Sequence, residues 1–356
     1  MNLQSRIRKL RAELAPKGLD AFISVQNARY LSGTTAAAAV IVSDEGPVLL
    51  CSRLEFDRAK RESTIKDIQA YFPRRVPLRR DERVYFGEFW QLLAERLKSL
   101  NVRKVGYDDL RRETLQKLQR AHKADYLELP ELITELRKIK STQEISWLRK
   151  AAELAVEGMA RATELIDGGR SELEIAAEAE YAMRKNGSEG TSFSTIVASG
   201  ENSWLPHATA TSRRLHRGEL IVVDLGATCN GYVSDMTRTF SLKPTARQLK
   251  LLSIVKRAQA AAIKRVRSGV KAADVDTAAR KVISRAGYGQ FCSHGTGHGV
   301  GLEIHESPSL APGSEDVLRD GMVITVEPGI YLPGVGGARW EDMLVLTAKS
   351  YKILTQ

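Results

Sequence analysis

The residues of this sequence best suited to chemistry are four carboxylates and one histidine, each in a strand-like or glycine-rich segment: Asp224, Asp235, His298, Glu327 and Glu341. Carboxylates that meet in a folded core repel one another, because burial removes the water that screens their charges. Divalent cations can balance such a set. If the chain brings these side chains together, two divalent metal ions are the simplest compensation.

A predicted β-hairpin places the first two carboxylates close together. Two β-prone runs flank Asn230-Gly231, which is a strong signal for a two-residue turn. This turn pairs Gly226 with Asp235, so Asp224 lies two residues along the strand from the partner of Asp235. Side chains alternate along a strand, and diagonal neighbours on one face lie about 7–8 Å apart at the backbone. The two aspartates can then share one metal ion or bridge two.

The glycine-rich segment 293–306 holds three of the six histidines. Its glycines let the backbone and side chains approach a ligand closely. A phosphate-binding loop is the competing function, but the segment has neither GxGxxG at the start of a helix nor GxxxxGK[ST]. We therefore expect a ligand site that includes His294, His298 and His305.

A second acid pair lies in the last predicted strands. The apolar run 323–326 ends at Glu327. Residues 336–337, both glycines, are expected to turn the chain into a strand over 338–346 that carries Glu341. Each acid alone is weak evidence, since most glutamates are solvated surface charges. The same alternative applies to the aspartates, although aspartate is depleted in strands.

The elements around these residues repeat along the chain. Gly169 and Gly187 bracket a predicted helix, and Gly269 and Gly287 bracket another of the same length, 100 residues later. Each follows a long predicted helix and precedes strands that carry an acid pair. The pattern predicts a duplicated helix–helix–strand–hairpin unit with the metal site between its halves.

The chain also divides into two predicted domains. Residues 1–128 alternate short strands with helical patterns, which is typical of an α/β domain. A junction follows near Leu129, and capping boxes at Ser141 and Ser171 begin two helices of the second domain, residues 129–356.

These motifs resemble those of the pita-bread metallopeptidases, the family of methionine aminopeptidase, aminopeptidase P and prolidase. The resemblance rests on VVDLGATCNGYVSDMTRTF, HGTGHGVGLEIHE, VEPGIY and GGARWED. It implies an α+β catalytic domain with duplicated helix–strand halves around a curved antiparallel sheet. Residues 27–33 resemble the N-terminal domain of the prolyl branch, which implies a smaller creatinase-like α/β domain before it.

The resemblance implies roles for the five ligands. Asp235 and Glu341 would bridge two metal ions, Asp224 would hold one of them, and His298 with Glu327 would hold the other. Glu327 would also move the proton between water and the leaving amine. The oxygen-rich set suggests two divalent metal ions, expected to be Mn²⁺, with Co²⁺ or Zn²⁺ as alternatives.

The resemblance extends to five further residues. His207 matches the family's first active-site histidine and is expected to act in catalysis and substrate binding. His305 would bind the scissile carbonyl as its oxygen becomes negative, and His294 matches a residue near the prolyl pocket. Arg339 and Tyr331 match positions that orient the metal-binding acids, and Arg339 is also expected to contact substrate.

The reaction depends on the branch of the family. Methionine aminopeptidase lacks the α/β domain, and creatinase lacks the full acid set, which is intact here. That leaves cleavage of the Xaa-Pro bond. Some prolidases have an arginine just after the HE-x-P segment, where this chain has Ser309, but its compact length resembles the short prolidases. We expect a Xaa-Pro dipeptidase, with aminopeptidase P as the alternative and a non-catalytic binding protein on the same fold as a third possibility.

Composition bounds the partners and the compartment. The chain has 356 residues, a net charge of +11 and three cysteines, whose unpatterned spacing suits a reducing cytoplasm. Its apolar runs are too short to span a bilayer. The basic stretch Arg74–Arg83 lacks interleaved aromatic residues and nucleic-acid motifs, so we expect a solvated loop. The expected state is a cytoplasmic homodimer that binds proline-containing peptides, without nucleic-acid or membrane partners.

Overall fold

The computed structural model describes residues 3–166 and 169–356. They form two compact units that divide between Arg137 and Lys138. The junction expected after residue 128 stays a prediction, and the division between the units falls in the last turn of helix α6 (Glu131–Lys138). None of the described helices is long and apolar enough to cross a membrane.

The first unit contains one mixed sheet of seven strands, in which the first three strands pair antiparallel and the other pairs are parallel. A core of buried aliphatic side chains joins the sheet to its helices. In spatial order the strands are β5 (Val84–Phe86), β4 (Asp67–Phe72), β3 (Gly46–Ser52), β2 (Ala39–Ser43), β1 (Ala21–Ser24), β6 (Lys104–Tyr107) and β7 (Asp125–Glu128). The helices are α1 (Leu3–Leu14), α2 (Ala28–Ser32), α3 (Phe56–Glu62), α4 (Phe89–Ser99) and α5 (Arg112–Ala121).

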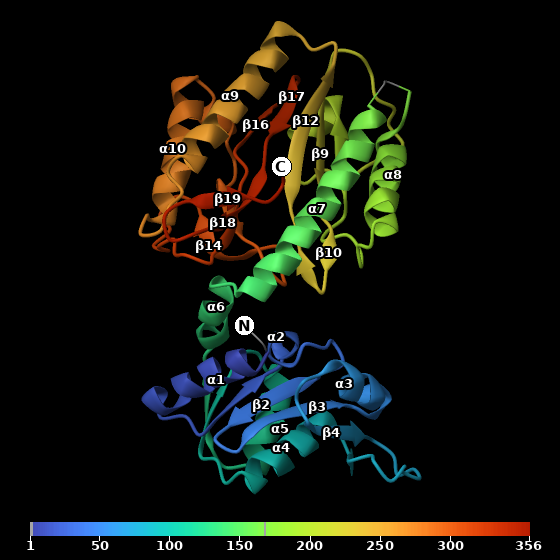
Figure 1. The fold of residues 1–356 in the computed structure, drawn as a ribbon, viewed down its shortest axis with the longest axis vertical. Coiled ribbons are helices and arrows are strands. Elements are labelled where there is room, and N and C mark those ends of the chain that lie inside the picture. The colour runs from blue at the N-terminus through green and yellow to red at the C-terminus, as the bar shows by residue number, and fades with distance from the viewer. Residues whose placement is uncertain (1–2, 167–168) are drawn as a thin grey trace. The chain divides into compact units, whose positions relative to one another are not determined.

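The second unit has two pairs of long helices, one on each flank of its strands (Figure 1). The first pair is α7 (Thr142–Glu164) and α8 (Glu172–Lys185), and the second is α9 (Ala246–Ile263) and α10 (Ala272–Arg285). The capping boxes predicted at Ser141 and Ser171 are both present. The bounds of α8 and α10 differ by 100 residues at both ends, as the predicted duplication requires.

The strands of the second unit form antiparallel sheets. One has the order β12 (Met236–Leu242), β9 (Glu219–Leu225), β8 (Ile196–Ser199). A second has the order β14 (Glu306–Leu310), β13 (Gly297–Gly299), β15 (Val323–Val326), β18 (Asp342–Leu346), β19 (Tyr351–Ile353). Two hairpins complete the set, β10 (Thr228–Cys229) with β11 (Tyr232–Val233), and β16 (Gly329–Leu332) with β17 (Gly336–Arg339).

The two halves of this unit meet where β12 lies beside β17. The Thr239 hydroxyl donates to the carbonyl of Arg339 at 2.7 Å. The backbone N–H of Glu341 donates to the carbonyl of Thr237 at 3.1 Å. The segment after β17 is therefore held against the first half.

The register predicted for the first hairpin is confirmed both beside the turn and further along the two strands. Cys229 pairs with Tyr232, and further along the hairpin Asp224 pairs with Thr237. Between these pairs the regular strands are interrupted, and the Ser234 hydroxyl accepts the N–H of Ala227 at 2.9 Å.

The prediction for the second hairpin is wrong in two respects. The turn lies at residues 333–335, and the two glycines at 336–337 begin β17. A Cβ on Gly337 would lie 2.0 Å from the carbonyl oxygen of Ser203, so this glycine allows a close approach of backbones. The expected strand 338–346 is also split at Trp340 and Glu341. The N–H of Glu341 donates to the carbonyl of Thr237, so residues 340–341 belong to neither β17 nor the sheet that contains β18.

Candidate metal centre

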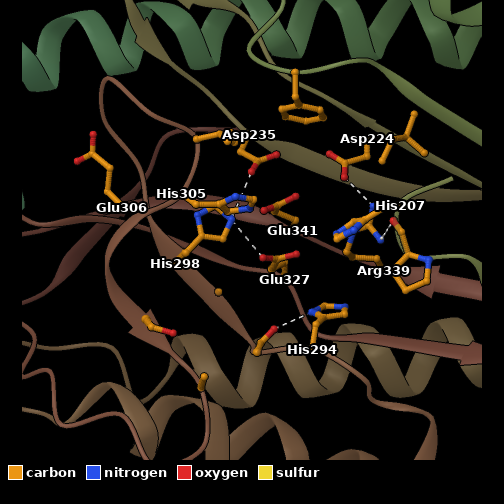
Figure 2. Close-up of a pocket in the computed structure, with 18 of the residues that line it drawn as sticks. His207, Asp224, Asp235, His294, His298, His305, Glu306, Glu327, Arg339 and Glu341 are labelled. Atoms are coloured by element: carbon orange, nitrogen blue, oxygen red, sulfur yellow. Dashed lines mark hydrogen bonds and ion pairs between the residues drawn. The ribbon is translucent and has the colours of Figure 1, made fainter. Parts of the chain in front are cut away.

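The second unit contains a cavity of about 840 Å³, into which four carboxylates point (Figure 2). Its lining includes nine of the ten predicted site residues: His207, Asp224, Asp235, His294, His298, His305, Glu327, Arg339 and Glu341. The tenth, Tyr331, is 5% exposed and contacts two of them. Segments from both halves of the duplication therefore converge on one space.

Three of the predicted ligands form a compact group. One ligand atom each from Asp235, His298 and Glu341 lies within 4.8 Å of the other two. Asp235 lies between β11 and β12, His298 lies in β13, and Glu341 lies between β17 and β18. Asp235 and Glu341 thus face the cavity from breaks between strands, whereas Asp224 faces it from within β9.

The hydrogen bonds of His298 determine which nitrogen faces the acids. Its Nδ1 lies 3.1 Å from the carbonyl oxygen of Gly299, which can only accept, so Nδ1 carries a proton. Its Nε2 lies 3.3 Å from Glu327 Oε1 and 3.6 Å from Asp235 Oδ2. Nε2 is therefore the ring atom available to a metal ion.

The cavity contains more acidic groups than positively charged side chains to balance them. Burial, and then the charges of Glu341 and Asp224, raise the pKa of Asp235 well above its ordinary value. Burial, and then Glu327 and Asp224, do the same to the pKa of Glu341. Such acids hold protons unless a cation replaces them.

Glu327 and His298 form the exception within this group. Burial opposes ionisation of Glu327, but the hydrogen bond and charge of His298 lower its pKa to about 2. In return, the pKa of His298 is raised despite its burial, because the Glu327 carboxylate stabilises the charged ring. Each partner therefore favours the charged form of the other.

Two buried carboxylate oxygens among the described residues have no hydrogen-bond partner, Asp224 Oδ1 and Glu341 Oε1. The other oxygen of each is satisfied. Asp224 Oδ2 accepts from Arg339 Nη2 at 2.6 Å, and Glu341 Oε2 accepts from the Thr237 hydroxyl at 2.8 Å. Unpaired buried oxygens are costly, and a divalent cation would satisfy both. The donor set, four carboxylates and one imidazole, fits hard divalent ions.

Arg339 links the acids to a histidine on the cavity wall. Its Nη1 donates to the hydroxyl of Tyr331 at 2.7 Å, and that hydroxyl lies 2.8 Å from Nε2 of His294. Since Nδ1 of His294 lies 2.7 Å from the carbonyl oxygen of Gly295, Nδ1 is the donor and Nε2 accepts the Tyr331 proton. Burial lowers the pKa of His294, which agrees with a neutral ring.

The other two histidines lie in exposed positions at the cavity. His305 packs edge to face on His298, with ring centroids 4.4 Å apart, and the partial burial of its ring, followed by the charge of His298, lowers its pKa. His207 follows the 3₁₀ helix η3 (Gly200–Trp204), on the side of the cavity where Arg339 lies (Figure 2).

Thr237 is a site residue that the sequence reasoning missed. Its hydroxyl donates to Glu341 and accepts from Arg339 Nε at 3.0 Å, so one side chain holds an acid and a guanidinium. The signal was available, because Thr237 lies directly opposite Asp224 in the predicted register.

The basic stretch Arg74–Arg83 lies in the first unit, and none of its residues lines the cavity. Arg79 pairs with Asp57 at 2.7 Å, and Arg83 approaches Asp67 at 3.5 Å. Acids within the same unit therefore offset part of its charge.

Comparisons with known proteins match both units. A family model described as "Metallopeptidase family M24" matches residues 146–348, and one described as "Creatinase/Prolidase N-terminal domain" matches residues 6–139. A Xaa-Pro dipeptidase of Pyrococcus horikoshii is 37% identical over 360 residues, which cover 99% of this chain and 97% of that protein.

Solved structures give the same picture. A Xaa-Pro dipeptidase from Bacillus anthracis has a TM-score of 0.92 and 32% identity, and the match covers 100% of this chain and 98% of that one. An X-Pro aminopeptidase from Thermotoga maritima has a TM-score of 0.87 and 31% identity, with 99% and 97% covered.

Proposed function

The chain belongs to metallopeptidase family M24, with a creatinase/prolidase N-terminal domain before a pita-bread catalytic domain, and from this premise we propose that it is a Xaa-Pro dipeptidase. It would hydrolyse the bond between an N-terminal residue and proline. The observation that carries this proposal is the group Asp235, His298 and Glu341, with Asp224 and Glu327 on the same cavity. The similarity to Xaa-Pro dipeptidases along nearly the whole chain supports the substrate class.

Two divalent ions held by Asp224, Asp235, His298, Glu327 and Glu341 would supply a Lewis acid and a water nucleophile at neutral pH. We propose Mn²⁺, because carboxylate oxygens dominate the ligand set. Arg339 and Thr237 keep Asp224 and Glu341 oriented toward the cavity, which reduces the reorganisation needed when cations bind.

Glu327 is the proposed proton carrier. Its carboxylate lines the cavity beside His298, where it can accept a proton from the attacking water. The nitrogen of a prolyl leaving group has no hydrogen before cleavage, so it must gain one as the bond breaks. A carboxyl group that has just accepted a proton can supply it.

The histidines would position the substrate. His305 lies beside His298, where it can donate to the carbonyl oxygen as negative charge develops. His207 and the neutral His294 line other parts of the cavity, and we propose that they contact the peptide on either side of the scissile bond.

Aminopeptidase P remains the second candidate, and one observation favours it. Arg339 is the only Lys or Arg among the described residues that line the cavity, and it already binds Asp224 and Tyr331. Ser309 stands where some prolidases have an arginine. The free carboxylate of a dipeptide would therefore rely on histidines and hydroxyl groups.

A peptide-length series tests the choice. Turnover of Ala-Pro, Ala-Pro-Ala and longer peptides is measured with added Mn²⁺, with Met-Ala as the control for the methionine branch. A dipeptidase cleaves Ala-Pro with the highest kcat/KM. A rise of kcat/KM with length would assign the aminopeptidase activity, and cleavage of Met-Ala without Met-Pro would reject both.

We also propose a cytoplasmic homodimer whose stretch Arg74–Arg83 binds no nucleic acid. The pairing of Arg79 and Arg83 with acids supports the last point. Light scattering during gel filtration measures the oligomeric state. Tight binding to a random duplex at physiological salt, lost when Arg74, Arg75, Arg79 and Arg80 are replaced by Gln, would overturn the proposal for the stretch.

A further inference from the structure

A buried carboxylate outside the cavity forms hydrogen bonds to a segment of the cavity wall. Glu172 is the first residue of α8 and has no exposed surface. Its Oε1 accepts the N–H and the hydroxyl of Ser199, both at 2.7 Å. Its Oε2 accepts the N–H of Thr211 at 3.0 Å and the Thr211 hydroxyl at 2.6 Å. Asn202 Nδ2 lies 3.2 Å from both oxygens.

Ser199 and Thr211 are the two ends of one segment of the cavity wall. Between them lie residues 206–209, which line the cavity and include His207. The carbonyl of Pro206 also accepts from Arg339 Nη1 at 3.3 Å. Glu172 therefore fixes both ends of a segment whose middle faces the substrate space.

Burying the carboxylate of Glu172 costs free energy, so a contribution to stability alone does not explain why it is there. A buried carboxylate without a cation partner is tolerated only when hydrogen bonds satisfy it. The nearby Arg213 pairs with Glu219 and donates to the Ser199 hydroxyl at 2.8 Å. An apolar residue could fill the space under the segment, but it could not define the positions of both ends.

The second half of the duplication contains a related arrangement, although its acid also pairs with Arg280 at 2.8 Å. Asp276 on α10 is 1% exposed and accepts the Thr296 hydroxyl at 2.8 Å and its N–H at 3.2 Å. Thr296 lies between His294 and His298. In each half, a buried acid on the second helix holds the segment that carries active-site histidines.

We propose that Glu172 is a positioning residue that sets the place of His207 in the substrate cavity by holding residues 199 and 211. The kinetic part of this inference rests on the proposed peptidase function. The structural part concerns the order of residues 199–211 and can be measured without any substrate.

Glu172→Gln is the first test. The amide of Gln has the same shape as the carboxylate, but one of its two oxygen acceptors is replaced by an NH₂ donor. At one end of the segment this NH₂ group would meet another donor and lose the hydrogen bonds found there. The backbone bond from Leu173 to Thr211, at 3.0 Å, remains. We expect kcat/KM for Ala-Pro to fall about tenfold or more, mostly through KM, because small displacements of positioning groups are costly. The bound Mn²⁺ per chain should stay unchanged.

Glu174→Gln is the matched control. Glu174 lies on the same helix and accepts the N–H and hydroxyl of Ser171, at 2.7 and 3.0 Å, in the capping box. This variant keeps an amide oxygen for the N–H of Ser171, loses the negative charge at the start of α8, and leaves the 199–211 segment alone. It should lower the Tm only slightly and leave KM within about twofold.

Thr211→Val supplies a second variant that removes one hydroxyl donor from an exposed residue and leaves Glu172 in place. Its effect on KM should be non-additive with that of Glu172→Gln, because both act on one contact. Hydrogen exchange of residues 199–211 should accelerate in both variants and not in Glu174→Gln. If the three variants share the same KM and the same exchange, Glu172 is only a structural residue. If the wild type does not cleave Ala-Pro, the proposed function fails, while the exchange measurement still tests the positioning.

Discussion

Asp224 and Asp235 face the same cavity, yet their surroundings give them different tasks. Asp224 is bound by Arg339 at 2.6 Å, so it has a cation within the protein. Asp235 has His298 at 3.6 Å and otherwise faces other acids. The first aspartate is part of a buried ion pair, and the second depends on cations from solution.

This difference predicts opposite effects of two isosteric changes. Asp235→Asn should lose most of the bound metal ions while the metal-free protein keeps its stability, because the neutral amide needs neither a cation nor a bound proton. Asp224→Asn should destabilise the metal-free protein by about 3 kcal/mol, because the buried guanidinium of Arg339 loses its ion pair with Asp224. Metal content and thermal unfolding after chelation measure the two effects. Equal metal loss and equal Tm in both variants would contradict the distinction.

The raised pKa values of Asp235 and Glu341 predict how pH acts on the metal-free protein. Folding makes these acids hold protons that the unfolded chain releases above a pKa of about 4, so the free energy of unfolding falls as pH rises. His298 acts in the same direction, because its raised pKa gives stability at low pH that is lost as pH rises. Glu327, with a pKa of about 2, stays ionised between pH 5 and 8 and adds no slope.

Bound Mn²⁺ removes the need for those protons. The difference in Tm between metal-loaded and chelated protein should therefore grow from pH 5 to pH 8. Differential scanning calorimetry at several pH values measures it, with Asp235→Asn as the control that should show little difference. A constant or shrinking difference would mean that the acids are not the metal ligands.

Residue types and spacing were sufficient to predict that Asp224 and Asp235 share one face, because strand alternation and the Asn230-Gly231 turn act locally. His207 and Arg339 were expected only from the family resemblance. The chain of hydrogen bonds from Arg339 through Tyr331 to His294 could not be predicted in this way. It joins β16, β17 and the loop before β13, and no local pattern in the sequence specifies that contact.

At the scale of elements, one glycine pattern in the sequence predicted the structure correctly and another did not. The 100-residue spacing of paired glycines predicted α8 and α10. The pair at 336–337 was interpreted as a turn, but Gly337 is needed where two backbones come close. A glycine that forms a turn and a glycine that allows two backbones to come close look alike in the sequence. Only the packing of a distant segment distinguishes them.

Gly297 is a second glycine of this kind, and it gives a prediction for β13. A Cβ on Gly297 would lie 2.1 Å from the carbonyl oxygen of Thr325 in β15. Gly297→Ala should therefore separate the strands, destabilise the protein by about 2 kcal/mol or more, and displace His298. Gly190→Ala is the control, because its Cβ would meet only Arg184 Nη2, at 3.7 Å. Chemical unfolding and metal titration of both variants check the result, and equal behaviour would contradict it.

At the scale of the whole molecule, each of the two units has a core of its own. All the predicted metal ligands lie after Lys138. Calorimetry should therefore show two transitions, of which added Mn²⁺ raises only one, because a ligand stabilises the unit that binds it. Asp235→Asn should abolish the shift. A single transition that moves as a whole would show that the units unfold together.

The site draws its ligands from both halves of the duplication, and this order has a consequence for synthesis. A nascent chain that has emerged only as far as Leu242 contains Asp224 and Asp235 but none of His298, Glu327 and Glu341. Such a chain offers two acids and no imidazole from this set, so it cannot capture an ion as the finished protein would. Metal loading is therefore delayed until almost all of the polypeptide has left the ribosome, and an unfinished product is kept from becoming an active hydrolase.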